Sequence, residues 1–349
     1  MGSVPAVDCE GLRQRHAAFW ENGAHILLEE VTAYRPLGVY AEAGGLPLAD
    51  GSRSVEGQLL TPELVDPARF FAGGSVPCRA TSGDFFTALA PPHLCWTEAV
   101  VGCPVRVGRG GPWAQPFAQD WRSPAAIEPQ ARWLERLEQF VRLLVERAAG
   151  RCAVVQPLLR GPVDMMAAAM GHEAACVALV QEPAAAGAFL ARCAELFVAT
   201  AQRCRQHIPR FAGGCVSTYG IWAPGAVVRT QIDNATMLSP ATYRDGVLPH
   251  DRAVMRQFEF PYIHVHSGCL HVAEALADVP ELRAIQVSID HPGGPLAAAI
   301  MPALARIVRR KPLIVTGPVT AAELADLREL ARWGSVCLRV EVYAEERGC

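Results

Sequence analysis

Two histidines in the segment YIHVH (262–266) form the clearest chemical motif of the sequence. Residues two apart on a strand point to the same side, so His264 and His266 are expected to project together. Such a pair can share a metal ion, and catalytic zinc needs a third protein ligand plus an open position. The alternative is a metal-free pair that binds carboxylates or acts as a general acid or base. Sequence spacing does not choose among the candidate third ligands, which are Asp233, Cys269, Asp290, Cys337 and Glu341.

The second half of the chain alternates short β-branched runs with helical stretches, which is typical of parallel βαβ units. An eighth strand would complete an α/β fold of the (β/α)8 TIM-barrel type, and 100–107 and 214–220 compete for that place. The other predicted strands are 24–31, 152–157, 227–233, 262–266, 284–290, 312–317 and 336–343. The predicted helices are 183–207, 271–278, 295–309 and 320–333.

We expect one domain over residues 1–349, because this length suits a barrel with insertions. Residues 151–343 would form most of the barrel. The segment 35–150 is rich in Pro, Gly and Trp and is interpreted as a cap or insertion. Its tryptophans could line the barrel mouth, although burial in the core is their commoner place. These tryptophans are Trp96, Trp113 and Trp121.

The alternation within the strands predicts which side chains face the barrel interior. The outward side must be apolar because it packs against helices, so Ile263 and Val265 should face outward. The same test turns polar residues of four strands inward. Barrel interiors are normally apolar, so this lining indicates an active site at the C-terminal strand ends. The inward residues are Arg229, Gln231, Asp233, Tyr262, His264, His266, Gln286, Ser288, Asp290, Cys337, Arg339, Glu341 and Tyr343.

From this lining we assign three sets of candidate site residues. The metal ligands are His264, His266, Cys269 and Cys337, with zinc as the expected ion and a metal-free site as the alternative. The catalytic candidates are Asp233, Asp290, Arg339 and Glu341. The substrate-binding candidates are Trp96, Gln156, Arg229, Gln231, Tyr262 and Gln286.

Composition excludes several other classes of protein. Hydrophobic residues make up 51% of the chain and the net charge is only -3, which excludes a disordered chain. No basic run favours a nucleic acid partner, and His172 and Glu173 interrupt the longest apolar stretch before it could span a membrane. The twelve cysteines form no CxxC pair. We therefore expect reduced, mostly buried thiols in a cytoplasmic protein.

Several segments resemble the uroporphyrinogen decarboxylase superfamily, which includes corrinoid-linked methyltransferases. The resemblance covers about 150–343, in matching order, and implies a (β/α)8 barrel with its site at the C-terminal strand ends. The segments are LLRGPVDMMAAAMG (158–171), QIDNATMLSPATYRDGVLP (231–249), YIHVHSGCLHVAEAL (262–276) and LIVTGPVTAAELADL (313–327). In addition, DFFTALAPP (84–92) and WTEAVVGCPV (96–105) resemble an uncharacterised decarboxylase-like subgroup.

The departures from this resemblance limit what it implies. Glutamates in ENGAHILLEEVTAY (21–34) stand where true uroporphyrinogen decarboxylases carry arginines, which argues against the haem-pathway reaction. The methyltransferase branches have a His-x-Cys zinc motif at His264 and His266, with a later cysteine near the position of Cys337. Here His266 replaces the first cysteine. The uncharacterised subgroup has His-x-Asp, so a ligand other than sulfur is compatible with the superfamily.

Three functional hypotheses follow. The first is metal-assisted methyl transfer to a small molecule at the barrel mouth. The second is a cofactor-free decarboxylase of a carboxylated substrate, including a tetrapyrrole, in which Asp233 or Asp290 stabilises a protonated intermediate while Arg229 or Arg339 holds the carboxylate. The third is a non-catalytic small-molecule-binding protein. The partners considered are a small-molecule substrate, a corrinoid protein and a second copy of the chain, with neither nucleic acid nor membrane.

Overall fold

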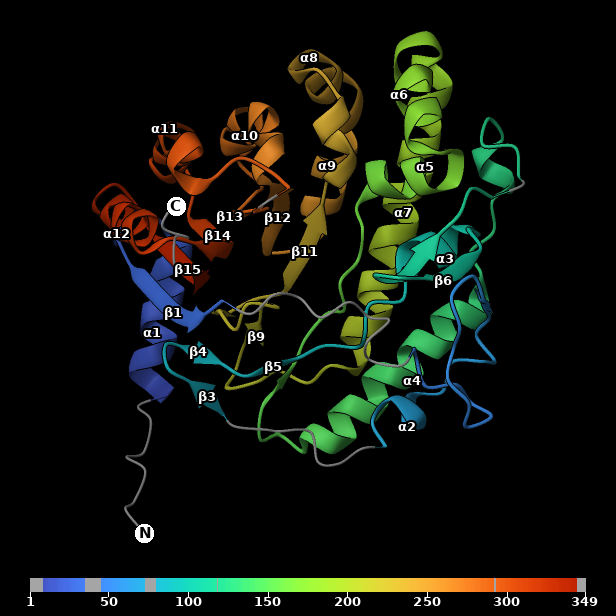
Figure 1. Cartoon of the computed structure of the whole chain (residues 1–349), viewed down its shortest axis with the longest axis horizontal. Helices are drawn as coiled ribbons and strands as arrows, with labels where there is room; N and C mark the ends of the chain where they lie inside the picture. Colours follow the sequence, from blue (N-terminus) through green and yellow to red (C-terminus); the bar gives the residue numbers. More distant parts are fainter. Residues whose placement is uncertain (1–8, 35–44, 73–79, 118, 292, 344–349) are drawn as a thin grey trace, which may run out of the picture.

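The computed structural model describes residues 9–34, 45–72, 80–117, 119–291 and 293–343. Its centre is a six-stranded parallel sheet in the order β1-β15-β14-β13-β12-β11 (Figure 1). The predicted α/β class is therefore confirmed, and strands successive in sequence are neighbours from β11 to β15. The strands are β1 (Leu27–Ala33), β11 (Val227–Gln231), β12 (Phe260–His266), β13 (Ala284–Ser288), β14 (Leu313–Val319) and β15 (Val336–Val342).

Helices cover the outer face of this sheet, as Figure 1 shows for α10, α11 and α12. Ile263 and Val265 of β12 are fully buried in the main hydrophobic core on this side. On the inner side, Phe19 and Trp20 of α1 pack in a second cluster with Tyr262. The predicted facing of β12 is therefore confirmed. The helices are α1 (Cys9–Trp20), α9 (Leu248–Met255), α10 (Leu270–Ala277), α11 (Ala297–Val308) and α12 (Ala321–Glu329).

Neither predicted eighth strand joins the parallel sheet. Segment 100–107 enters β6 (Val105–Gly108), which pairs antiparallel with β2 (Leu59–Leu60) and β7 (Gly111–Ala114). Segment 214–220 contains β9 (Cys215–Val216), which pairs antiparallel with β10 (Trp222–Ala223). A different parallel pair forms between β5 and β8. These two strands have two residues each, too few to show alternation, and they are β5 (Ala88–Leu89) and β8 (Ala153–Val154).

Side chains from segments next to β8 and β4 (Phe85–Phe86) contact the two edges of the six-stranded sheet. Just after β8, Gln156 Nε2 donates to the Arg229 carbonyl at 3.0 Å, and Gln156 Oε1 accepts from the Arg229 amide at 3.4 Å. At the other edge, the Asp84 carboxylate accepts from the Glu29 amide at 3.1 Å. Gln156, predicted to bind substrate, therefore connects strands.

The described part of 35–150 shares the main core of the molecule. Trp96 and Phe140 belong to the same buried cluster as Val228 and Ile263 of the sheet. Helices α3 and α4 also pack against α7, so this segment is not a separate globular unit. Elements of this segment include α2 (Pro67–Phe70), β3 (Thr81–Ser82), β4 (Phe85–Phe86), α3 (Trp96–Val101) and α4 (Ala131–Ala148). The helices that follow it are α5 (Pro162–Met170), α6 (His172–Gln181) and α7 (Pro183–His207).

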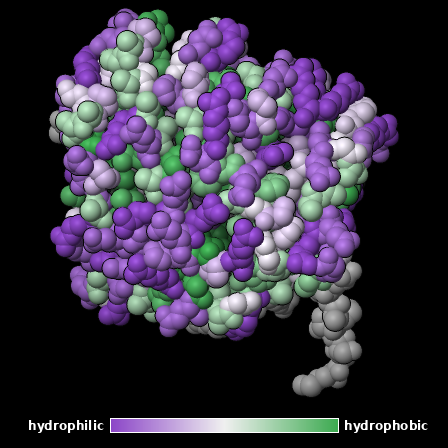
Figure 2. Space-filling view, turned by 180° about the vertical axis from the view of Figure 1, so that it is seen from behind, coloured by the Kyte–Doolittle hydropathy of each residue, from purple (hydrophilic) through white to green (hydrophobic). Residues whose placement is uncertain are grey.

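Within the described ranges, one helix, α7, is long and apolar enough to cross a membrane. Half of its most apolar window is buried, and it packs against α3, α4, α5 and α9. Helices α5 and α6 pass the same test only as a pair, which is bent by 110°. Polar residues cover most of the face in Figure 2, with apolar residues in small separate areas. These features fit α7 as a core helix.

Most described cysteines agree with the expected free thiols. Nine are free, and six of these nine are buried. Burial raises the pKa of the Cys193 and Cys204 thiols, the latter to about 12, so both stay protonated at neutral pH. Cys152 departs from the expectation because it is disulfide-bonded.

Candidate metal centre

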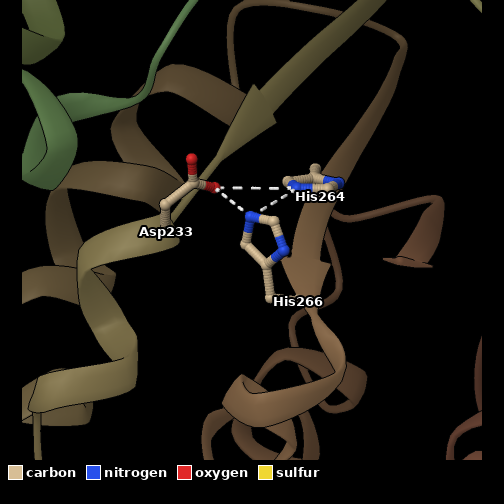
Figure 3. A group of neighbouring side chains, drawn as sticks. All are labelled: Asp233, His264 and His266. Atoms are coloured by element: carbon tan, nitrogen blue, oxygen red, sulfur yellow. Dashed lines mark hydrogen bonds and ion pairs between the residues drawn. The ribbon is translucent and has the colours of Figure 1, made fainter. Parts of the chain in front are cut away.

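His264 and His266 come from the C-terminal end of β12 and converge with Asp233, which follows β11 (Figure 3). The two Nε2 atoms are 3.3 Å apart. Asp233 Oδ1 lies 3.6 Å from His264 Nε2 and 3.4 Å from His266 Nε2. Among the described residues, these three form the group of His, Cys, Asp or Glu side chains that could hold a metal ion. Asp233 is thus the third residue that spacing alone left open.

These separations match the edges of a small coordination polyhedron. Metal–ligand bonds of 2.0–2.1 Å at tetrahedral angles place ligand atoms about 3.3–3.4 Å apart. The three observed edges are equal to this value or slightly longer. The His266 and Asp233 side chains are 36% and 31% exposed, so solvent reaches this side of the group. A fourth ligand from solution could therefore bind there.

His266 is oriented by a carboxylate on its far side. Its Nδ1 lies 2.9 Å from Asp290 Oδ1, while the Ser267 amide donates to Asp290 Oδ2 at 3.2 Å. A proton on Nδ1 donated to Asp290 leaves the Nε2 lone pair directed at the group centre. Metal-binding histidines commonly have such a carboxylate partner, which also makes them better ligands. Asp290, predicted as catalytic, lies where it can orient His266.

His264 is oriented by Gln286 on β13. Gln286 Nε2 donates to Thr316 Oγ1 at 2.8 Å, which turns Gln286 Oε1 toward His264 Nδ1. The Tyr219 hydroxyl donates to the same Oε1 at 2.9 Å. Because Oε1 can only accept, His264 Nδ1 must carry the proton and Nε2 must carry the lone pair. His264 is therefore held in the tautomer that metal binding requires, and His266 adopts it when it gives up its Nε2 proton and keeps the Nδ1 proton that faces Asp290.

Asp233 has one bonded and one unbonded carboxylate oxygen. Oδ2 accepts from Gln231 Nε2 at 2.9 Å, and Gln231 Oε1 accepts from Arg229 Nη1 at 2.7 Å. Oδ1 is buried and makes no hydrogen bond of good geometry in the described structure, although His266 Nε2 lies 3.4 Å away. A buried unpaired acceptor is energetically unfavourable unless a cation or donor occupies the site. This orphaned oxygen is the one that faces the two histidines.

Asp164 in the first turn of α5 positions this ligand, and the sequence analysis missed it. Its two carboxylate oxygens accept from the Asp233 amide at 3.1 Å and the Asn234 amide at 2.9 Å. Burial, followed by the nearby charge of Asp233, raises the pKa of Asp164 well above the usual carboxyl range. The sequence signal that could have pointed to Asp164 is its place two residues after Gly161-Pro162, where an acidic residue falls in the first turn of a helix.

Without a metal, the two histidines differ sharply in proton affinity. Burial lowers the pKa of His264 to about 3, so it is neutral. Hydrogen bonding to Asp233 and then to Asp290 raises the pKa of His266 to about 10. Burial opposes ionisation of Asp233, but the hydrogen bond from His266 and the adjacent charges bring its pKa below the usual value. The site thus favours a cation among its three ligand atoms.

The two predicted cysteine ligands lie outside this group. Cys269 is buried, with Sγ 2.7 Å from Thr236 Oγ1, and is not one of the three converging residues. Cys337 lies in the apolar cluster with Phe19, Trp20 and Tyr262, where burial raises its pKa. The inward facing of Cys337 was predicted, but its neighbours are apolar. Tyr262 in the same cluster bonds to Thr218 Oγ1 at 2.5 Å.

The remaining predicted residues have structural partners. Trp96 is fully buried, stacks edge-on with Trp133 and Phe140, and donates to the Pro92 carbonyl at 2.8 Å, so it is a core residue. Arg339 pairs with Glu30 and donates to the Tyr219 carbonyl at 3.0 Å. Glu341 lies on β15 between Thr32 and Pro318 of the neighbouring strands.

Comparison with known proteins adds no further assignment. No family model matches the chain, and no curated protein matches it significantly. The functional argument therefore depends on the geometry of Asp233, His264 and His266.

Proposed function

We propose that this chain is a metal-dependent enzyme of the uroporphyrinogen decarboxylase-like type, acting on a small molecule at the mouth of a (β/α)8 barrel. Six strands form one parallel sheet, and the β5–β8 pair would complete the ring between β1 and β11. The contacts of Gln156 and Asp84 across the two gaps support this closure. Asp233 and His266 lie at the C-terminal strand ends, where such barrels carry their sites.

The observation that carries the proposal is the convergence of the buried Asp233 Oδ1 with the Nε2 atoms of two histidines. Two imidazoles and a carboxylate at these separations suit zinc with one open position. Each ligand is also fixed by an outer partner: Gln231 for Asp233, Gln286 for His264 and Asp290 for His266. Such outer partners are typical of metal sites.

Zinc in this position would lower the pKa of a bound small-molecule thiol and hold it as an anion. The resemblance to corrinoid-linked methyltransferases then favours one-carbon transfer. The new S–C bond would form as the methyl–carrier bond breaks, with its electron pair remaining on the carrier. The thiol proton would leave to solvent, which reaches the exposed side of His266. Asp233, His264 and His266 bind and orient the acceptor.

The decarboxylase hypothesis has weaker support. It needs an arginine available for the substrate carboxylate, yet Arg339 pairs with Glu30 and Arg229 donates to Gln231. Both predicted arginines already have partners.

Metal content tests the proposal directly. We expect about one zinc per chain in protein purified without a polyhistidine tag, measured by elemental analysis. His266→Gln and Asp233→Asn should lose it, whereas His250→Gln on α9 should keep it. The loaded protein should then demethylate methylcobalamin in the presence of a small thiol. Metal content equal in all four proteins, or stoichiometric demethylation by the metal-free protein, would contradict the proposal.

A further inference from the structure

A second buried polar group adjoins the metal centre. Arg160, in the loop before α5, and Glu98, in α3, form an ion pair with Nε 3.3 Å from Oε1. Glu98 is fully buried and the Arg160 side chain is 22% exposed. Neither of these two atoms makes a hydrogen bond of good geometry in the described structure. The pair is thus close but incompletely satisfied.

Helix α3 and Trp113 hold Arg160 in one orientation. The Thr97 hydroxyl accepts from the Arg160 amide at 3.0 Å and lies 3.0 Å from Glu98 Oε2. The guanidinium carbon lies 5.8 Å from the centre of the Trp113 ring. The closest contact with Glu98 is made by Nε, and within the described residues no hydrogen bond joins the two terminal nitrogens of Arg160 to a partner. The bidentate edge of the guanidinium remains available.

The loop that carries Arg160 is in direct contact with the strand that leads to Asp233. A Cβ on Gly161 would lie 2.2 Å from the Gln231 carbonyl oxygen, so only glycine permits this approach. Three residues later, Asp164 accepts from the Asp233 amide. Arg160 and Asp233 also interact electrostatically. Arg160 therefore lies close to the proposed metal centre.

His93 adds a further unsatisfied atom to this region. Its Nδ1 is buried and has no hydrogen-bond partner in the described structure. Burial lowers its pKa, and it interacts electrostatically with Glu98, Arg160, Arg229 and Asp233. His93 Nδ1 has no partner and the Arg160–Glu98 pair is incompletely satisfied. Together these features indicate a site for a polar ligand, because buried polar groups normally find partners.

We propose that Arg160 anchors an oxyanion group of the substrate, a carboxylate or a phosphate, while the other end of the substrate binds the metal. This inference rests on the proposed function. Arginine presents a planar fork of donors that matches both oxyanions. If Arg160 served only as the counter-ion of Glu98, a paired contact through its fork would be expected. The Nε contact instead leaves the fork open.

Binding of matched thiols to the zinc-loaded protein tests this role. The probes are 3-mercaptopropionate, 2-mercaptoethyl phosphate and neutral 3-mercaptopropanol, with affinities measured by calorimetry. We expect at least one anionic thiol to bind the wild type about tenfold or more tightly than the neutral thiol, as a charge-assisted pair provides. We call the ratio of each anionic thiol's affinity to that of the neutral thiol its anionic advantage. The anion with the larger advantage, carboxylate or phosphate, is the preferred ligand.

Three variants separate anchoring from folding. Arg160→Gln should reduce the anionic advantage to within about twofold and leave the affinity of the neutral thiol unchanged. Arg160→Lys keeps a counter-ion for Glu98 but lacks the fork, so it should also lose most of the advantage. Arg309→Gln removes an arginine that stacks on Trp333 elsewhere and should keep the full advantage. An advantage that survives in both Arg160 variants overturns the inference.

A metal-free measurement keeps the two proposals distinguishable. If the protein binds no zinc, the proposed function fails, and binding of propionate and inorganic phosphate is then measured by ligand-observed NMR. Binding of either anion that is lost in Arg160→Gln and kept in Arg309→Gln supports the anchor. Equal binding to all proteins, or none to the wild type, overturns it.

Discussion

Asp290→Asn is expected to weaken metal binding without removing a ligand. Asp290 Oδ1 lies 2.9 Å from His266 Nδ1, and Oδ2 accepts from the Ser267 amide at 3.2 Å. Asparagine has one acceptor oxygen and no charge, so it cannot serve both donors equally. Loss of such an outer partner typically reduces metal affinity by about 10- to 100-fold, or about 1.4–2.7 kcal/mol.

Competition with a chromophoric chelator measures this loss as a shift in the apparent Kd for zinc. The matched control is Asp278→Asn, which removes an exposed carboxylate paired with Arg310 at 3.3 Å and should leave the Kd unchanged. Thermal unfolding of both metal-free variants verifies that the fold persists. An Asp290→Asn affinity within twofold of the wild type would refute the argument that Asp290 orients His266.

Three further perturbations test other parts of the structure. Trp96→Ala should cost about 3–5 kcal/mol of stability in urea unfolding and leave the zinc Kd unchanged, because Trp96 lies in the core; a weaker zinc affinity would contradict this. Asp164→Ala should weaken zinc binding, measured by chelator competition, because the Asp233 amide loses its acceptor. Burial raises the pKa of Asp251 to about 7, so its ionisation increasingly opposes folding from about pH 4 to pH 7. The free energy of unfolding of Asp251→Asn should therefore rise by about 3 kcal/mol relative to that of the wild type between pH 4.5 and pH 7. A difference in urea unfolding that is the same at both pH values would refute the raised pKa of Asp251.

Strand alternation predicted the inward facing of His264 and His266 because side chains on a strand alternate with a period of two. The apolar outward residues, Ile263 and Val265, fixed the phase of that alternation. The sequence could not select Asp233 as the third residue, because Asp233 follows the end of β11 and its position depends on backbone contacts. Those contacts come from Asp164, 69 residues earlier.

Short strands and contacts between distant segments also explain the incorrect predictions. The strand predicted at 152–157 is present as the short β8, but its parallel partner β5 was missed. Two residues give no periodic signal, whereas the longer apolar runs at 100–107 and 214–220 do. Cys337 points inward as predicted, but it lies in a cluster with Phe19 and Trp20 from α1. Trp96 faces Trp133 and Phe140, a contact that composition could not distinguish from a cap over the mouth.

Anomalous diffraction at the zinc absorption edge tests the central claim most directly. Crystals of protein purified without a polyhistidine tag should show one peak about 2.0–2.2 Å from His264 Nε2, His266 Nε2 and Asp233 Oδ1. A zinc-soaked crystal with no peak among these three atoms, or with its peak at Cys269 instead, would contradict the account.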